Sequence, residues 1–296
     1  CGWTRRFSQR WGVPYWAVPH GSLDPWVFTY GALFKKVWLS LSGQPYLRNA
    51  AAVIFATRRE RDKAAERYNG ANTRVIHWPV KPFDLAQREA ARANLRASLG
   101  LPPEARILLY LGRYDGMKKP VETIQAFVAA KCQRTTLVLV GNDSGMKKAD
   151  LEQAAREAGA ADSTRVAGPR FGAEQVEAFL GSDGFVSLSH RENFGYTSAE
   201  ALSAGLPVIL SPGNDLAHEL TELSCGWMLQ SEDHDEAVRA IREFDAAESD
   251  ALRDIGARGR EWATAHLSFD AFQQGLRDLQ SATTGNAQAA SATSPR

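Results

Sequence analysis

Two carboxylates, Glu192 and Glu200, flank the start of a predicted helix, with seven residues between them. Backbone N–H groups at that helix start, together with the helix dipole, suit an anion such as phosphate. Gly195 lets a ligand approach the backbone closely. A carboxylate repels phosphate but accepts hydrogen bonds from sugar hydroxyls, so the pattern favours a ligand that carries both groups. A solvated helix face with two acids would show the same spacing.

The surrounding residues predict a strand, a polar loop, a helix and a second strand in succession. The apolar run 184–188 is short enough for a buried strand, and the helical pattern covers 195–204. Gly205 takes the C-cap position, Pro207 prevents continuation, and 208–210 forms the next strand. In a βαβ unit of this kind, the loop at the carboxyl end of the first strand is a favoured ligand site.

A glycine-containing loop with three cations is the second candidate. It follows the apolar run 106–111, which predicts a strand buried on both faces, and reads GRYDGMKKP. Arginine can fork onto two phosphate oxygens, and lysine adds a mobile point charge. The loop lacks the GK[ST] ending of a P-loop. The phosphate-site candidates are Gly112, Arg113, Lys118 and Lys119; an exposed turn with solvated cations is the alternative.

His20 is the candidate from the N-terminal part of the chain. Residues 12–20 predict a short strand that ends in a turn, so His20 lies at a strand's carboxyl end. A lone histidine is more often a surface residue or a satisfied core residue than a site residue.

Several of these segments together resemble a known family. The residues ENFG at 192–195, followed by EA at 200–201 and GLPV at 205–208, are similar to the E-x7-E signature of retaining GT-B glycosyltransferases of family 4. The resemblance implies that Glu192 faces the donor sugar and that Glu200 binds the ribose hydroxyls of the nucleotide. It also implies that the helix start holds the diphosphate, through Asn193, Phe194, Gly195 and Tyr196.

Three other segments carry the resemblance further. The cationic loop resembles the family's GR-x(4–5)-K-G loop, so Arg113 and a lysine would clamp the diphosphate; Lys119 aligns better than Lys118, although Pro120 replaces the usual glycine. PHGSLDPW at 19–26 resembles a segment whose histidine lies in the cleft near the sugar, which gives His20 that role. The turn after the predicted strand 164–167 lies beside the base in relatives, which implies nucleotide-binding roles for Val166 and Arg170.

The resemblance covers residues 10–280 and implies an α/β protein with the GT-B fold, in which two doubly wound Rossmann-like domains have parallel sheets. We expect the rest of an incomplete N-terminal, acceptor-side domain at 1–80, a nucleotide-sugar donor-binding domain at 81–280 and a disordered tail at 281–296. The sequence HWPVKP at 77–82 departs from the family's Pro-Asn-Gly turn but still predicts a stiff linker.

Composition limits the other functions. The net charge of +1 argues against a nucleic-acid partner, and three scattered cysteines fit a reducing compartment without a disulfide framework or a metal site. No stretch approaches the roughly 18 apolar residues of a membrane span. Aromatic residues and lysines mix over 28–47, which predicts a packed helix or, second, a helix at a membrane surface. We expect a cytoplasmic protein, with the inner face of the membrane as a further location.

The resemblance implies an enzyme that moves a sugar from a nucleotide diphosphate sugar to a hydroxyl of a glycan or lipid-linked acceptor, with retention of configuration. Polysaccharide, exopolysaccharide or glycolipid synthesis would be its setting. We expect no cofactor besides the donor substrate and no metal, because no Asp-x-Asp is placed to hold one. Two alternatives stay open: an inactive fragment, or a protein that binds nucleotide sugar without turnover. A dinucleotide oxidoreductase is disfavoured because no G-x-G-x-x-G opens a helix after a strand.

Overall fold

The computed structural model describes residues 2–29 and 31–292, with side chains described as far as residue 283. Contacts within the chain divide it into two compact units. Unit 1 comprises Cys1–Pro79 and Phe269–Arg296, and unit 2 comprises Val80–Ser268. Each unit is described by itself below.

Unit 1 contains a small parallel sheet in the order β1-β2-β3, surrounded by helices. Its elements are α1 (Gly2–Trp11), β1 (Trp16–Ala17), η1 (Pro25–Phe28), α2 (Ala32–Trp38), η2 (Leu39–Gly43), α3 (Gln44–Asn49), β2 (Ala52–Phe55), α4 (Arg58–Ala64), β3 (Thr73–Val75) and α13 (Phe269–Ala292). The central strand β2 is buried along its whole length because side chains pack on both of its faces. Val53 and Phe55 join one core cluster, while Ala52 and Ile54 join a second cluster that includes Leu279 of α13.

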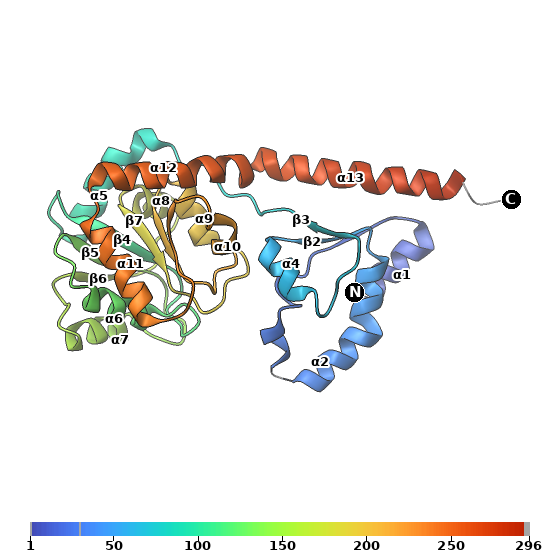
Figure 1. Cartoon of the computed structure of the whole chain (residues 1–296), viewed down its shortest axis with the longest axis horizontal. Helices are drawn as coiled ribbons and strands as arrows, with labels where there is room; N and C mark the ends of the chain where they lie inside the picture. Colours follow the sequence, from blue (N-terminus) through green and yellow to red (C-terminus); the bar gives the residue numbers. More distant parts are fainter. Residues whose placement is uncertain (1, 30, 293–296) are drawn as a thin grey trace. The chain divides into compact units, whose positions relative to one another are not determined.

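Unit 2 alternates strands and helices. Its elements are η3 (Leu85–Gln87), α5 (Arg88–Leu99), β4 (Arg106–Leu111), α6 (Pro120–Ala130), β5 (Thr135–Val140), α7 (Lys148–Glu157), β6 (Thr164–Ala167), α8 (Ala173–Leu180), β7 (Gly184–Ser187), α9 (Tyr196–Ser203), β8 (Val208–Leu210), α10 (Ala217–Leu220), β9 (Gly226–Met228), α11 (His234–Ala246) and α12 (Ser249–His266). Helices lie on both faces of its sheet (Figure 1), with α6 packed on α11, α5 on α8, and α9 on α12. Because helices cover both faces, the strands are buried on both sides, which explains their continuous apolar runs.

The six strands of unit 2 are all parallel and lie in the order β6-β5-β4-β7-β8-β9. Numbered from β4, this is the doubly wound order 3-2-1-4-5-6. The chain winds outward in one direction from β4 and in the other direction from β7. Ligands of such sheets bind at this switch point, beyond the carboxyl ends of the two central strands.

The C-terminal segment differs from the sequence prediction. Helix α13 begins at Phe269 and continues to Ala292, where we expected a disordered tail from residue 281. The segment is rich in alanine, the best helix former, which favours continuation of the helix. Contacts also assign α13 to unit 1, whereas the expected second domain ran to residue 280. The end of the predicted tail, 293–296, lies outside the described residues.

Candidate functional site

The loops that follow β4 and β7 meet at the switch point of the unit 2 sheet. The backbone N–H of His190 donates to the carbonyl of Met117 at 2.8 Å, which ties the two loops together. Residues 112–119 and 188–195 were predicted separately, and the strand order brings them to one place.

Glu192 lies at the centre of this corner and is held on both sides of its backbone. Its N–H donates to the Gly213 carbonyl at 2.8 Å, and its carbonyl accepts from the Asp215 N–H at 2.9 Å. Its carboxylate forms an ion pair with the Lys118 ammonium, and both side chains are largely buried. Glu192 therefore joins the loops after β4, β7 and β8 and presents a carboxylate beside a cation.

The cationic loop is shaped by Asp115. One oxygen of this carboxylate accepts from the backbone N–H groups of Met117 at 3.0 Å and Lys118 at 3.1 Å, while the other pairs with Arg113 at 3.2 Å. The pKa of Lys118 is lowered to about 8, chiefly by burial and then by the neighbouring Arg113 charge, while Asp115 opposes the shift. The Arg113 side chain is 60 % exposed, so its guanidinium is accessible to a ligand.

Lys119 makes a different contact from its neighbour. Its ammonium pairs with Glu232, and the same carboxylate contacts Nδ1 of His190 at 2.8 Å. The Lys119 backbone is left-handed, with φ of 50°, and caps the start of α6 ahead of Pro120. Lys118 and Lys119 thus pair with carboxylates from two different loops.

The start of α9 is packed so tightly that side chains would not fit. Gly195 has φ of 76°, and a Cβ there would lie 2.8 Å from Nδ2 of Asn214. Asn214 is fully buried; it donates to Ser198 Oγ at 2.8 Å and accepts from the Leu216 N–H at 3.1 Å. The N-cap residue of α9, Gly195, has no side chain to cap the first turn, which suits these N–H groups to binding an anion.

The other residues of this helix divide between core and site. Phe194 is 3 % exposed and packs edge-on against Tyr196 at 5.1 Å, while the Tyr196 side chain is 54 % exposed. Glu200 is partly buried, and this burial raises the pKa of its carboxyl group. Gln175 Nε2 donates a long hydrogen bond of 3.4 Å to the carboxylate, and this bond opposes the rise in pKa. Its carboxylate can accept further hydrogen bonds from a ligand's hydroxyls.

Three predicted site residues contribute no side chain to this corner. Val166 packs on the hydrophobic core, and Arg170 donates to Ser98 Oγ of α5 at 2.9 Å. Gly112 follows β4, and a Cβ there would lie 3.5 Å from the Tyr110 hydroxyl. Backbone groups at Val166 and Gly112 keep their predicted roles as expectations.

His20 belongs to unit 1. It is exposed, has a left-handed backbone with φ of 49°, and its ring lies 5.3 Å from the Trp78 ring. The next N–H, at Gly21, donates to the buried Glu60 carboxylate at 2.7 Å. This contact fixes the turn that presents the imidazole.

A protein-family model described as "Glycosyl transferases group 1" matches residues 91–262, more than half of the chain. The chain belongs to this family. The match extends from within α5 into α12 and includes both loops of the candidate site. The family and the GT-B fold predicted from the sequence are therefore confirmed.

Curated relatives and solved structures agree with this assignment. The D-inositol 3-phosphate glycosyltransferase of Streptomyces avermitilis is 28% identical over 282 residues, covering 89% of this chain and 60% of the relative. That of Salinispora arenicola is 26% identical, covering 94% of this chain and 65% of the relative. The chain thus spans less than two thirds of the length of these relatives.

Two solved structures share the fold. Sucrose-phosphate synthase from Thermosynechococcus elongatus superposes with a TM-score of 0.76 at 22% identity, covering 97% of this chain and 72% of that one. Anabaena HepE in complex with UDP and glucose gives a TM-score of 0.75 at 19% identity, covering 94% of this chain and 74% of that one.

In this glycosyl transferases group 1 chain, the preference for Lys119 over Lys118 stays a prediction, and the two lysines have different partners. It is Lys118 that contacts Glu192, because Lys119 adopts the left-handed conformation next to Pro120 and pairs with Glu232. The family pattern has glycine in this loop, and glycine adopts that conformation most readily. Lys119 thus has a backbone conformation that glycine favours.

Sequence reasoning missed several residues that build this corner. None of Asn214, Glu232 and His190 was predicted as a site residue. Their shared signal is position, because each follows the carboxyl end of a strand. Gly213 had a clearer signal as a glycine in such a loop: a Cβ there would lie 2.2 Å from the His190 carbonyl oxygen.

The described residues contain neither a metal-ligand cluster nor a membrane-spanning helix. Within residues 2–29 and 31–292, no group of three or more His, Cys, Asp or Glu side chains could hold a metal ion. Across the same residues, no helix is long and apolar enough to cross a bilayer.

Proposed function

We propose that this chain transfers a sugar from a nucleoside diphosphate sugar to a hydroxyl acceptor, with retention of anomeric configuration. The observation that carries the proposal is the convergence of Lys118, Glu192 and the uncapped start of α9 at the switch point. Such a corner offers positive charge to a diphosphate and carboxylates to sugar hydroxyls. The UDP and glucose in the HepE complex make UDP the first nucleotide to test.

Each residue has a role in this proposal. Arg113, Lys118 and the α9 N–H groups bind the diphosphate and stabilise the charge that develops as it leaves. Glu200 accepts hydrogen bonds from the ribose, and Glu192 orients the donor sugar. In the transfer step the bond from the anomeric carbon to the diphosphate oxygen breaks, and the acceptor oxygen bonds to the same face. The acceptor's proton passes to the leaving diphosphate.

The proposal includes neither a cofactor nor a metal ion. Two side-chain cations and a helix start supply the positive charge that a divalent ion supplies in other enzymes of nucleotide sugars. Transfer should therefore proceed at an unchanged rate in EDTA. Full recovery of activity only on adding Mg²⁺ or Mn²⁺ would contradict this part.

Calorimetric titration with UDP, GDP and ADP tests the donor site on wild type and Glu200→Ala. One nucleotide should bind, and Glu200→Ala should weaken it by about 1–3 kcal/mol because charge-assisted hydrogen bonds to ribose are lost. Glu157→Ala, on exposed α7, is the matched carboxylate control and should leave binding unchanged.

Incubation with the sugar ester of the bound nucleotide then separates the candidates. Release of nucleoside diphosphate with transfer to an acceptor supports the enzyme. Binding without transfer or donor hydrolysis supports the alternative, a nucleotide-sugar-binding protein. A folded chain that binds none of the three nucleotides rejects both.

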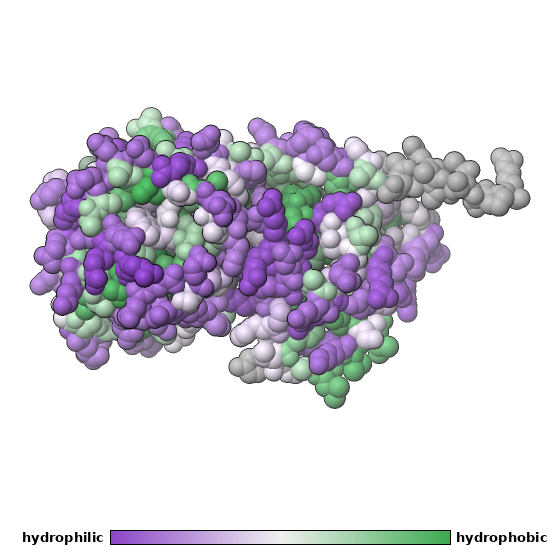
Figure 2. All heavy atoms as spheres, in the orientation of Figure 1, coloured by the Kyte–Doolittle hydropathy of each residue, from purple (hydrophilic) through white to green (hydrophobic). Residues whose placement is uncertain are grey.

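The acceptor is a second part of the proposal. The relatives named D-inositol 3-phosphate glycosyltransferase make an inositol phosphate one acceptor to test, beside glycans and lipid-linked sugars. A lipid-linked acceptor fits a cytoplasmic protein that contacts the membrane surface. Exposed Leu33, Phe34 and Leu41 lie beside Lys35 and Lys36 on α2 and η2, and Figure 2 shows apolar side chains gathered at this end of unit 1.

Co-sedimentation with vesicles measures that contact. Vesicles containing anionic lipid should bind the chain more strongly than neutral vesicles, and Phe34→Ser should weaken the binding. Equal binding to both vesicle types would show that the lysines do not contribute to membrane binding.

A further inference from the structure

A polar cavity of about 300 Å³ lies at the amino-terminal edge of the unit 2 sheet. Its walls include Asp183, which precedes β7, and Pro207, which precedes β8. The candidate donor site lies at the carboxyl ends of the same strands. The cavity is therefore a separate place in unit 2, at the opposite edge of the sheet.

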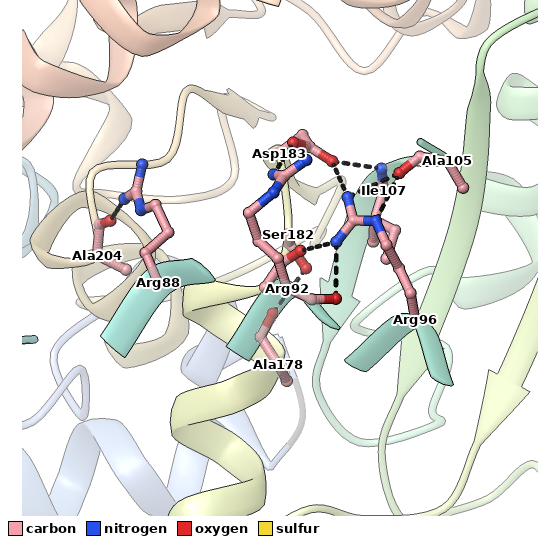
Figure 3. Close-up of polar contacts among 10 residues, drawn as sticks. Arg88, Arg92, Arg96, Ala105, Ile107, Ala178, Ser182, Asp183 and Ala204 are labelled. Carbon is pink, nitrogen blue, oxygen red and sulfur yellow. Dashed lines mark hydrogen bonds and ion pairs between the residues drawn. The ribbon is translucent and has the colours of Figure 1, made fainter. Parts of the chain in front are cut away.

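Arginines dominate the charge of this cavity. Arg88 and Arg92 project into it from α5 and Arg253 from α12, against the carboxylates of Glu89 and Asp183. Asp183 is already engaged: it accepts from Arg92, from Arg96 at 2.9 Å and from the Ile107 N–H at 2.8 Å (Figure 3). Arg253 pairs with the exposed Asp250. The three guanidinium groups together have more N–H donors than these carboxylates accept, so donors are in excess at the cavity wall.

Arg88 shows this excess most directly. One terminal nitrogen donates to the Ala204 carbonyl at the end of α9, whereas its Nε is buried with no hydrogen-bond partner in the described part of the chain. Burial lowers the pKa of Arg88, and the nearby charges of Arg260 and Arg92 lower it further. An unpaired buried donor costs about 1–3 kcal/mol, and an anion would satisfy it.

The remaining walls fit a small organic anion. Leu206, Pro207 and Leu252 give an apolar floor, and Ser249 adds a hydroxyl. Gly205 permits this construction, because a Cβ there would lie only 3.2 Å from Nη2 of Arg88. Planar guanidinium groups bind carboxylate or phosphate oxygens in pairs, and a phosphate has enough oxygens to accept from several arginines at once.

We propose that the cavity formed by Arg88, Arg92 and Arg253 binds a small phosphate-bearing metabolite, at a site distinct from the donor site. The proposal does not depend on the transfer reaction. It names the phosphate group as the recognised chemistry, and the apolar floor as the place for the rest of the ligand.

Calorimetric titration with inorganic phosphate, at constant ionic strength in chloride, tests the site. Arg92→Gln should weaken phosphate binding by about tenfold, the effect of losing one charge-assisted hydrogen bond. Arg253→Gln should weaken it less, and this exposed residue can be changed without disturbing the fold. Arg113→Gln removes a donor-site cation and should leave the cavity's phosphate binding in place, while Arg239→Gln controls for net charge.

A second measurement locates the ligand on the chain. Modification of arginines by phenylglyoxal, mapped by peptide mass spectrometry, should slow at Arg92 and Arg253 when phosphate is present, and not at Arg239. Loss of phosphate binding in Arg113→Gln alone would overturn the proposal. So would unchanged binding in both Arg92→Gln and Arg253→Gln, or equal protection at Arg239.

Discussion

Lys118 and Lys119 are adjacent in the sequence but have different surroundings in the structure. Lys118 is largely buried beside Glu192, whereas Lys119 pairs with Glu232. The sequence alone could not show which lysine faces Glu192. That depends on the left-handed backbone of Lys119, which the turn into α6 imposes. Glu192, Glu200 and Gly195 could be predicted, since their spacing and the helix start are local properties.

Replacing each lysine by alanine tests this assignment. Lys118→Ala should lower the transfer rate by about 100-fold or more, as expected when one donor to the developing charge is removed. Lys119→Ala should lower it by less than about tenfold, because Lys119 contacts Glu232 and not Glu192. Steady-state rates with the donor identified by titration measure both effects; thermal unfolding of each variant excludes loss of the fold. The reverse order of the two losses would restore Lys119 as the diphosphate lysine.

The same residues predict how kcat/KM for the donor depends on pH. Lys118, whose pKa is lowered to about 8, carries its charge below that pH and loses it above, so kcat/KM should fall as pH rises through about 8. Glu200 must be ionised to accept from ribose, and its raised pKa moves the acid limb above the usual carboxyl range.

Lys118→Arg checks the alkaline limb of this profile. A guanidinium stays charged throughout this range, so the fall above pH 8 should disappear. A limb that persists at the same pH in this variant would assign it to another group.

At the scale of elements, Asp183 anchors α5 to the sheet. It pairs with Arg92 and Arg96 of α5 and accepts from Ile107 of β4. Arg96 is only 2 % exposed, so the loss of Asp183 would leave a buried guanidinium without its counter-charge. Local patterns predicted α5 and β4, but no pattern within 88–111 reveals a partner at position 183.

Asp183→Ala should lower the free energy of unfolding by about 3 kcal/mol, the scale measured when one partner of a buried ion pair is removed. Urea denaturation measures the change. Asp250→Ala is the matched control, because Asp250 pairs with Arg253 in an exposed position and should contribute less than about 0.5 kcal/mol. Similar losses in both variants would mean that Asp183 has no anchoring role.

Most strands of both sheets could be predicted from short apolar runs, because burial on both faces leaves a plain signal. Helix α6 was missed because it begins at Lys119 and Pro120, which were read as loop; proline is in fact favoured at the first helical position. Strand order is a tertiary property, so the meeting of the two loops was expected only through the family resemblance.

At the scale of the whole molecule, the chain's last helix completes its first unit. Phe272, Leu276 and Leu279 of α13 pack in the cluster that contains Ile54 and Ile76. A Cβ at Gly275 would lie 3.2 Å from Ile76, so α13 approaches this residue closely. Residues far apart in sequence thus form one core, although the expected domains 1–80 and 81–280 placed them apart.

A chain ending at Ser268 should therefore lose order in unit 1 and keep it in unit 2. Each large apolar side chain removed from a core costs roughly 1.5–3 kcal/mol of burial. Hydrogen exchange should become faster in β2 and β3, whereas β4, β5 and β7 should keep their protection. Unchanged exchange in β2 would show that α13 does not support that sheet.

The crowding around Gly195 and Gly213 bears on how sequence variation in this protein is to be interpreted. Neither position has room for a methyl group, because Asn214 and the His190 carbonyl fill the space. In a mutant library selected only for folding, both positions would tolerate almost no substitution. Glu192 and Arg113 would become intolerant only when selection demands turnover. Comparing the two selections would distinguish the positions of this corner that folding requires from those that catalysis requires, which a single selection cannot do.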